Sequence, residues 1–362
     1  MVHFEDIIGY EEEKAEMQRL CDILKNKEKY ERMGVCPPQA ILLYGVPGVG
    51  KTLMAKALID ESGRKCYYCR KNRPDGEFVT LIQETFSEAA KNAPSIVFLD
   101  DMDKFAEDNL SEDSNKEEFA AIQSCMEDIK GKEVFVVATA NDIAYIPDSL
   151  MRVGRFGRQI RFFPPKYEDT VKIIGHYLIG KKIDSSINAE MIADILCGKS
   201  CVVLENTINE AGIYAAFDNS PVITKEHLTK AILRVLSKEI GKANDPKRKS
   251  EIAYHEAGHA LMSCLQNKKI GILTINQYGG SGGFCAIPDT NEKIVSYDDA
   301  LDDLKVAIAG KAAFFLLTGK EDLGARSDID QACESIRPAI EKNCAEGFAF
   351  GYPASTGCLR VV

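Results

Sequence analysis

The chain has 362 residues, which at about 150 residues per domain suggests two or three domains with cores of their own. Hydrophobic residues make up 45% of it and charged residues 28%, a composition that excludes a largely disordered or fibrous protein. The net charge of −10 gives no general electrostatic affinity for nucleic acid, so we expect no nucleic-acid partner. The longest apolar stretch, residues 306–317, contains Lys311 and is shorter than the about 20 residues of a membrane-spanning helix, so we expect no intrinsic membrane segment.

The cysteines and the N-terminus indicate the compartment. The first residues, MVHFEDIIGYEEEK, turn acidic at once and lack the features of a secretory signal. Twelve cysteines in a chain of this size do not form the dense framework of a small secreted domain, so we expect reduced thiols and a cytoplasmic location. Cys66 and Cys69 form a single C-x-x-C motif without a second pair, and we interpret them as packing and loop residues rather than as a zinc or redox site.

The first part of the chain, residues 1–165, alternates short apolar runs with helical patterns. The runs at residues 40–44, 96–99 and 134–138 are continuously apolar, as in strands that are covered on both faces. They predict an α/β domain with a parallel sheet. Pro164 and Pro165 end this part, because proline continues neither a strand ladder nor a helix.

The remainder is predicted to be mainly helical. Residues 166–241 contain apolar positions at helical spacing in four stretches, 168–179, 188–196, 202–217 and 224–240, with Asn188 and Thr224 as candidate caps. The polar stretch 242–250 is interpreted as a linker. A third part, residues 250–362, begins with a helix over 251–265 and contains a glycine-rich segment at 279–283. The acidic run at 107–118 is interpreted as a solvated surface.

A phosphate-binding loop follows the first predicted strand. Residues 45–52, GVPGVGKT, match the pattern G-x-x-x-x-G-K-[ST] and precede a helical pattern over 53–59. In such a loop successive backbone N–H groups bind phosphate oxygens, and the following helix N-terminus adds positive potential. Lys51 is expected to reach the β- and γ-phosphates, and the Thr52 hydroxyl to bind Mg²⁺.

Polar residues at the ends of two other predicted strands complete a nucleotide-hydrolysis site. Asp100 and Asp101 follow the strand at 96–99, and Asn141 follows the third strand. We expect Asp100 to act on Mg²⁺, Asp101 to polarise the attacking water and Asn141 to orient that water from the side.

A metal-binding motif lies in the third part. His255 and His259 are four residues apart, so on a helix both imidazoles lie on one face and can share a Zn²⁺ ion. Glu256 is the candidate general base that takes a proton from zinc-bound water. Zinc needs a third protein ligand, and motif counting alone leaves five carboxylates open: Glu321, Asp322, Asp328, Asp330 and Glu334.

These motifs resemble those of the AAA+ ATPases and, within them, of the FtsH-type ATP-dependent zinc proteases, from about residue 4 to about residue 351. The resemblance implies an AAA+ large α/β domain at 1–165, a small helical lid domain at 166–241 and a mainly helical zinc metallopeptidase domain at 250–362. It implies ATP, Mg²⁺ and Zn²⁺ as cofactors. It also implies an edge strand at 279–285 that pairs with an extended substrate.

Individual roles follow from the same resemblance. Asp328, in the segment 323–329, corresponds to the family's aspartate ligand. Arg155 and Arg158 correspond to arginine fingers that reach the γ-phosphate bound by the next subunit, which implies a homo-hexameric ring. The nucleotide-binding residues are then Ile8, Gly9, Pro47, Gly48, Val49, Gly50, Lys51, Thr52, Leu53, Asp100 and His176, with Ile8 and Gly9 against adenine.

The sequence departs from the family pattern at several positions. Asp101 stands where the family has glutamate, and the shorter side chain predicts slower hydrolysis. The aromatic pore loop that grips substrate is not recognisable, and Phe78-Val79 is its candidate remnant, with Thr80 in place of glycine. Cys201-Val202 replaces a Gly-Ala pair near adenine. No membrane segment precedes residue 4, and the chain ends soon after residue 351.

Two functions fit this pattern. The first is an ATP-dependent zinc metalloendopeptidase that unfolds and degrades polypeptides, which the intact residues of the zinc motif favour. The alternative is an AAA+ remodelling or regulatory ATPase with a weak or vestigial protease domain, which the altered pore loop, Asp101 and the short C-terminus favour.

Overall fold

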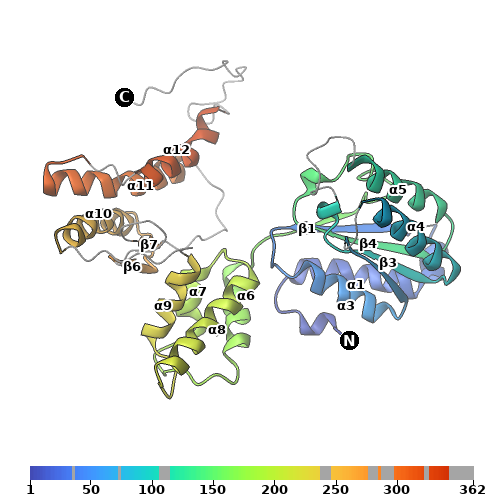
Figure 1. Cartoon of the computed structure of the whole chain (residues 1–362), viewed down its shortest axis with the longest axis horizontal. Coiled ribbons are helices and arrows are strands. Elements are labelled where there is room, and N and C mark those ends of the chain that lie inside the picture. The colour runs from blue at the N-terminus through green and yellow to red at the C-terminus, as the bar shows by residue number, and fades with distance from the viewer. Residues whose placement is uncertain are drawn as a thin grey trace. The chain divides into compact units, whose positions relative to one another are not determined.

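The computed structural model (Figure 1) describes residues 1–34, 37–71, 75–105, 115–236, 246–275, 284–286, 297–321 and 326–341. The chain divides into two compact units. The first consists of Met1–Ile173 and Lys199–Leu204, and the second of Ile174–Gly198 and the described residues from Glu205 onward.

The first unit is built on a parallel five-stranded sheet in the order β2-β3-β4-β1-β5. Its strands are β1 (Ala40–Gly45), β2 (Lys65–Cys69), β3 (Ser95–Leu99), β4 (Val134–Ala140) and β5 (Gln159–Phe162). The predicted parallel α/β sheet is therefore confirmed. The central strands β1, β3 and β4 are the three predicted apolar runs. The edge strands β2 and β5 were not predicted, because exposed and partly exposed residues interrupt their apolar pattern.

Helices cover both faces of this sheet. Figure 1 shows α1 (Glu11–Lys25) and α3 (Lys51–Ser62) along one face, and α4 (Asp75–Lys91) and α5 (Asn115–Asp128) along the other. Successive residues of β1 point to opposite faces, so Ile41 and Leu43 join the core under α1 and α3 while Leu42 joins the core under α4 and α5. The short elements of this unit are α2 (Lys27–Glu31) and three 3₁₀ helices at Phe4–Asp6, Met102–Phe105 and Ile143–Tyr145.

Helices dominate the rest of the described chain. They are α6 (Tyr167–Leu178), α7 (Ala189–Leu196), α8 (Cys201–Phe217), α9 (Lys225–Leu236), α10 (Pro246–Leu265), α11 (Tyr297–Thr318) and α12 (Arg326–Glu341), with a two-stranded antiparallel sheet of β6 (Ile272–Thr274) and β7 (Phe284–Ala286). The predicted helices are confirmed over the described residues, and residues 237–240 of the predicted stretch 224–240 lie outside them. The Asn188 side chain caps α7 by accepting a hydrogen bond from the Met191 N–H at 2.8 Å.

The predicted linker is wrong over its second half. Helix α10 begins at Pro246, so residues 246–250 are helical. Proline suits the first position of a helix, because its fixed φ is helical and its missing N–H is not needed there. Residues 242–245 of the predicted linker and the glycine-rich segment at 279–283 lie outside the described residues.

The candidate pore-loop remnant belongs to the hydrophobic core. Phe78 lies on α4, is 0% exposed, and its ring centroid is 4.8 Å from that of Phe105 in a T-shaped contact. Val79 packs against the same core. A fully buried ring cannot grip a substrate, so the pore-loop interpretation of Phe78 is wrong. Residues 72–74, immediately before α4, lie outside the described residues.

Two smaller interpretations also need correction. The acidic run at 107–118 is not solvated throughout, since Glu118 is buried on α5 with its Oε1 3.9 Å from Lys71 Nζ. Residues 106–114 lie outside the described part. Cys66 and Cys69 lie on strand β2 rather than in a loop, and the buried Cys69 confirms their packing role.

The cysteines in the described residues, Cys66 and Cys69 included, are free thiols. Among the described helices, none combines the length and the apolar character that a membrane crossing requires.

Candidate nucleotide site and metal centre

The phosphate-binding loop connects β1 directly to α3. Gly48 and Gly50 have φ of +79° and +98°, a region that side-chain-bearing residues rarely adopt, so the turn depends on glycine at both positions. Helix α3 begins at Lys51, so the unpaired N–H groups of its first turn follow the loop. Val49 is buried in the core, whereas Pro47 and Leu53 are exposed. Backbone N–H groups at the start of α3 are thus the donors that this region can offer to an anionic ligand.

Lys51 is held by oxygen atoms at the base of the loop. It is only 5% exposed, and its ammonium donates to the carbonyl oxygens of Gly45 at 2.7 Å and Val46 at 2.9 Å and to Asn141 Oδ1 at 3.0 Å. Burial lowers the pKa of Lys51. An ammonium with uncharged partners gains more from phosphate oxygens, so the site is suited to an anionic ligand.

Thr52, the second residue of α3, and Asp100, which follows β3, lie within hydrogen-bonding distance of each other. The Thr52 hydroxyl donates to Asp100 Oδ1 at 3.2 Å, and the same oxygen accepts a hydrogen bond from Thr139 Oγ1 at 2.8 Å. Thr139 in turn accepts from the Asp101 N–H at 2.9 Å. Sequence analysis did not identify Thr139. The feature that could have indicated it is its position on β4, the neighbour of β3, two residues before Asn141.

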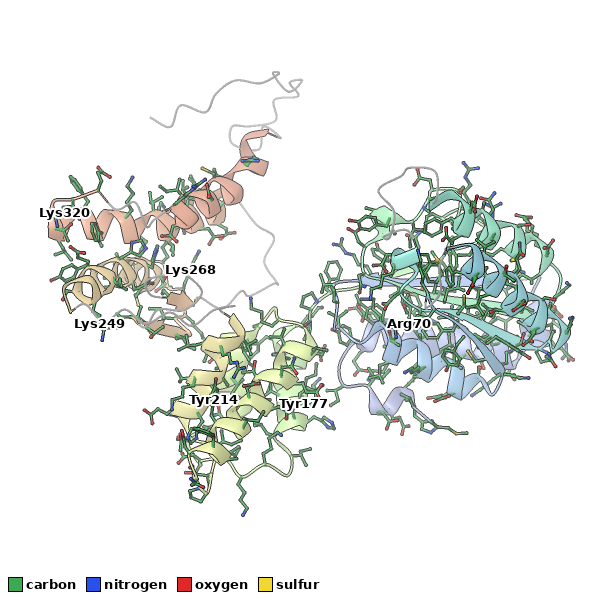
Figure 2. The ribbon with its side chains drawn as sticks, in the orientation of Figure 1. Arg70, Tyr177, Tyr214, Lys249, Lys268 and Lys320 are labelled. Carbon is green, nitrogen blue, oxygen red and sulfur yellow. The ribbon has the colours of Figure 1, made fainter. Side chains whose placement is uncertain are left out.

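Two basic side chains, Arg70 and Lys104, form ion pairs with the Asp101 carboxylate. Its Oδ2 accepts from Arg70 Nη2 at 3.1 Å and from Lys104 Nζ at 3.0 Å. Arg70, labelled in Figure 2, follows the last residue of β2. The Asp101 backbone has φ of +56°, which is unusual for a residue other than glycine. A water-polarising role for Asp101 therefore requires its carboxylate to exchange these partners.

Asn141 is positioned by a residue that sequence analysis missed. Asp103, 3% exposed, accepts from the Asn141 N–H at 2.9 Å and from Asn141 Nδ2 at 3.3 Å. Asn141 Oδ1 therefore faces Lys51. An Asp two residues after the Asp-Asp pair was the available signal.

The candidate arginine fingers make ion pairs within their own chain. Arg155 Nη2 lies 3.0 Å from Glu127 Oε1, and Arg158 Nε lies 2.9 Å from Glu16 Oε1. A trans role for Arg155 and Arg158 requires these pairs to open.

The remaining candidate nucleotide contacts lie on separate elements. Ile8 is partly buried, Gly9 has φ of +74°, and His176 is exposed on α6. The Val202 N–H donates to the carbonyl oxygen of Gly48 at 3.2 Å, so the start of α8 is bonded to the phosphate-binding loop.

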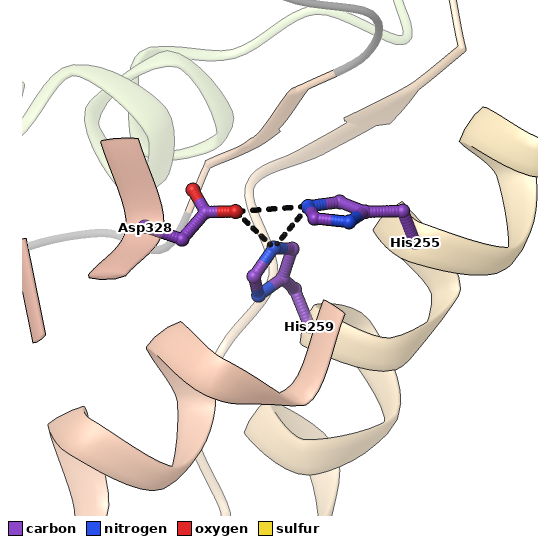
Figure 3. Close-up of side chains that lie close together, drawn as sticks. All are labelled: His255, His259 and Asp328. Atoms are coloured by element: carbon purple, nitrogen blue, oxygen red, sulfur yellow. Dashed lines mark hydrogen bonds and ion pairs between the residues drawn. The ribbon is translucent and has the colours of Figure 1, made fainter. Parts of the chain in front are cut away.

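Three side chains converge in the second unit (Figure 3). His255 and His259 project from α10 and Asp328 from α12. Asp328 Oδ2 lies 2.9 Å from His255 Nε2 and 3.5 Å from His259 Nε2, and the two Nε2 atoms are 3.0 Å apart. These ligand atoms are close enough together to bind one metal ion.

The tautomer of His259 fits a metal ligand. His259 Nδ1 lies 2.7 Å from the carbonyl oxygen of Val306, and because a carbonyl only accepts, Nδ1 is the protonated nitrogen. In the neutral ring this leaves the lone pair of Nε2 directed at His255 and Asp328. A hydrogen bond from the second ring nitrogen is the usual way in which proteins orient a metal-binding histidine.

The structure favours Asp328 as the third ligand over two of the other candidates, Glu321 and Asp330. Glu321 is exposed and forms an ion pair with Lys311 at 3.5 Å, and Asp330 is exposed. Asp322 and the side chain of Glu334 lie outside the described residues. Burial raises the pKa of Asp328, but hydrogen bonds with His255 and His259 outweigh burial and hold that pKa below its ordinary value.

Glu256 lies next to the ligands on α10. It is 6% exposed, and burial raises the pKa of its carboxyl above the ordinary value. A buried carboxylate beside a metal site has the character of a general base.

Comparison with known proteins agrees with both sites. Residues 41–164 match the AAA family of ATPases associated with various cellular activities, and residues 242–345 match peptidase family M41. The first match contains Lys51, Asp100 and Asn141, and the second contains His255, Glu256 and Asp328.

The chain is also similar to curated bacterial proteins. It is 31% identical to the ATP-dependent zinc metalloprotease FtsH 2 of Symbiobacterium thermophilum, over 99% of this chain and 63% of that protein. It is 31% identical to FtsH 1 of Alkaliphilus metalliredigens, over 94% of this chain and 61% of that protein. The corresponding values for the FtsH of Leptotrichia buccalis are 33%, 94% and 46%. The chain thus spans between about half and two thirds of the length of these curated relatives. The chain thus carries an AAA match over its phosphate-binding loop and an M41 match over its metal centre, and over nearly its whole length it is similar to proteins named ATP-dependent zinc metalloprotease FtsH.

Proposed function

We propose that this chain is an ATP-dependent zinc metalloendopeptidase that unfolds and cleaves polypeptides. The observation that carries the proposal is the convergence of His255, His259 and Asp328 beside the buried Glu256, in a chain that also contains the Lys51 loop. The matches to the AAA and M41 families and the similarity to FtsH zinc metalloproteases support Zn²⁺, ATP and Mg²⁺ as cofactors.

The protease half uses four residues. His255 Nε2, His259 Nε2 and one oxygen of Asp328 would hold Zn²⁺, and the Val306 carbonyl keeps His259 in the required tautomer. Zinc, when bound, lowers the pKa of a coordinated water and polarises a substrate carbonyl. Glu256 accepts a proton from the attacking water and passes it to the leaving amine. The raised pKa of the Glu256 carboxyl favours holding that proton between the two steps.

The ATPase half binds the triphosphate through the loop. Lys51 exchanges its carbonyl partners for phosphate oxygens, while Thr52 and Asp100 hold Mg²⁺. Asp101 and Asn141 act on the attacking water. Ile8, Gly9 and His176 contribute to the nucleotide pocket.

The proposal includes the assembly and the compartment. Arg155 and Arg158 act as fingers in a homo-hexameric ring once their pairs with Glu127 and Glu16 open. The free thiols of the described cysteines are consistent with a cytoplasmic location.

A casein digestion with and without ATP tests the function. We expect cleavage that needs ATP and disappears in Glu256→Gln, which keeps the size of the side chain but removes the base. Equal cleavage by Glu256→Gln would attribute the proteolysis to a contaminant. ATP hydrolysis without any cleavage would favour a remodelling ATPase with a vestigial protease domain.

A further inference from the structure

Gly310 on α11 faces the metal centre at very short range. A Cβ atom on this residue would lie 2.3 Å from His259 Nε2, 2.7 Å from His255 Nε2 and 2.7 Å from His259 Cε1. Gly310 lies in the interior of a helix and is not among the glycines with positive φ, so its backbone conformation is open to any residue. Glycine is needed at this position because a side chain would collide with the histidines, not because of the backbone conformation.

The space in front of Gly310 is the space that an ion needs. Zinc binds imidazole nitrogen at about 2.0–2.1 Å, so a carbon atom at the distances given above would compete with the ion for both nitrogens. Contact between a carbon and a ring atom becomes favourable only at about 3.5–4.0 Å. A side chain at Gly310 would therefore turn the imidazoles aside or exclude the ion.

The same helix orients one of the ligands. Val306, one turn before Gly310, accepts the hydrogen bond from His259 Nδ1 at 2.7 Å. Helix α11 thus contributes no ligand among its described side chains, yet its backbone fixes a ring and leaves the room in front of it.

We propose that Gly310 is a positioning residue: because it has no side chain, it leaves room for the metal ion beside His255 and His259. Helix α11 then shapes the metal cavity through its backbone alone. The proposal rests on the zinc chemistry proposed above. It predicts an unusual separation of effects for Gly310→Ala. Zinc binding is weakened, whereas the metal-free fold keeps its stability, because alanine is the better helix former and the nearest crowded atoms belong to side chains that can rotate.

Gly258 provides a matched control. It lies on α10 between the two histidines, and a Cβ there would be 2.4 Å from the carbonyl oxygen of Ala309 and 2.7 Å from Ala313 Cβ. None of its nearest atoms belongs to a metal ligand. Gly258→Ala forces α10 and α11 apart, so it lowers the unfolding temperature of the metal-free protein.

The experiment measures zinc affinity in the full chain by competition with a chromophoric chelator, and unfolding temperature in excess chelator. We expect Gly310→Ala to bind zinc at least about tenfold more weakly than the unmodified chain, at an unchanged metal-free unfolding temperature. An affinity within about twofold of the unmodified chain would overturn the proposal.

A cycle of variants keeps the test decisive if Gly310→Ala destabilises the metal-free protein. The three nearest clashing atoms all belong to the imidazoles, so the destabilisation should vanish when His255→Ala and His259→Ala are also present. A destabilisation that persists in this combined variant would assign Gly310 to helix packing and overturn the proposal. An unmodified chain that binds zinc but cleaves nothing would overturn the proposed protease function alone, and one that binds no zinc would overturn both.

Discussion

Asp103 holds Asn141 by two hydrogen bonds, one from the backbone N–H at 2.9 Å and one from Nδ2 at 3.3 Å. This pairing determines which end of the Asn141 amide faces the phosphate-binding loop. Asp103→Asn replaces one of the two acceptor oxygens by an NH₂ group, which cannot accept the hydrogen bond of the Asn141 donor that faces it. We expect the ATP hydrolysis rate to fall between about ten- and a hundredfold, because a misplaced polar group loses its alignment with the reacting water. A steady-state phosphate-release assay measures this rate. Asp148→Asn, at an exposed position, is the control and should leave the rate unchanged.

Removing Lys51 should weaken nucleotide binding. Lys51→Ala deletes the ammonium that is buried against the Gly45 and Val46 carbonyls, and with it the charge-assisted bonds to phosphate. We expect the dissociation constant for ATP to rise about ten- to a hundredfold, as measured with a fluorescent ATP analogue. Lys56→Ala, on the exposed face of the same helix, serves for comparison. Equal losses in both variants would mean that overall charge, not the loop contact, governs binding.

Metal removal should separate the two activities. A zinc chelator is expected to abolish casein cleavage while ATP hydrolysis continues, because the residues of the phosphate loop belong to a different unit from His255 and His259. Asp328→Ala should lower the zinc content measured by elemental analysis of the purified chain. Asp330→Ala, two residues along α12 and exposed, should not. Unchanged metal stoichiometry in Asp328→Ala would contradict its assignment as a ligand.

Arginine fingers supplied in trans, as proposed above, would make ATP hydrolysis depend on assembly. Since Arg155 and Arg158 pair with Glu127 and Glu16 of their own chain, a neighbouring subunit would have to open these pairs, and we expect specific ATPase activity to rise with protein concentration. Dilution series assayed for phosphate release measure this. At saturating concentration Arg155→Ala should be slow, whereas Arg161→Ala, whose guanidinium stacks on Phe163, should be normal. A specific activity that stays flat down to the monomer range would exclude fingers supplied in trans.

Phe78 should behave as a core residue. Phe78→Ala removes a fully buried ring and leaves a cavity beside Phe105, which we expect to destabilise the first unit by about 3–5 kcal/mol. Urea unfolding followed by tyrosine fluorescence and circular dichroism measures this loss. Phe78→Leu, which refills most of the cavity, should cost much less. A Phe78→Ala variant with normal stability and impaired substrate processing would restore the interpretation of Phe78 as a substrate-gripping residue.

The sequence predicted those parts of the sheet that are buried on both faces. Residues of β1, β3 and β4 form continuous apolar runs because helices cover both sides of them. The edge strands carry Lys65, Gln159 and Arg161 at positions that face away from the core, and these interruptions conceal β2 and β5. An edge strand of this kind can be recognised only once the strand that it pairs with is known, and the local sequence pattern does not specify that partner.

The functional sites also combine residues that are close in the sequence with residues that only the fold brings together. His255 and His259 are a local pair, because one helical turn brings them together. The contacts of Asp328, Thr139 and Asp103 instead depend on how α12 packs and how β3 lies beside β4, so spacing alone could not select Asp328 from its neighbours. Gly310 contributes by the absence of a side chain, which no pattern of functional groups reveals.

Asp328 and His255 are 73 residues apart in the sequence, and an ion bound by both would be a reversible cross-link between the two ends of that stretch. Such a cross-link stabilises the folded form by a free energy that grows with the logarithm of the free zinc concentration. Heat resistance of the peptidase segment would then report the zinc supply of its surroundings, and starvation for this ion would leave the segment easier to melt, and hence easier for other proteases to remove.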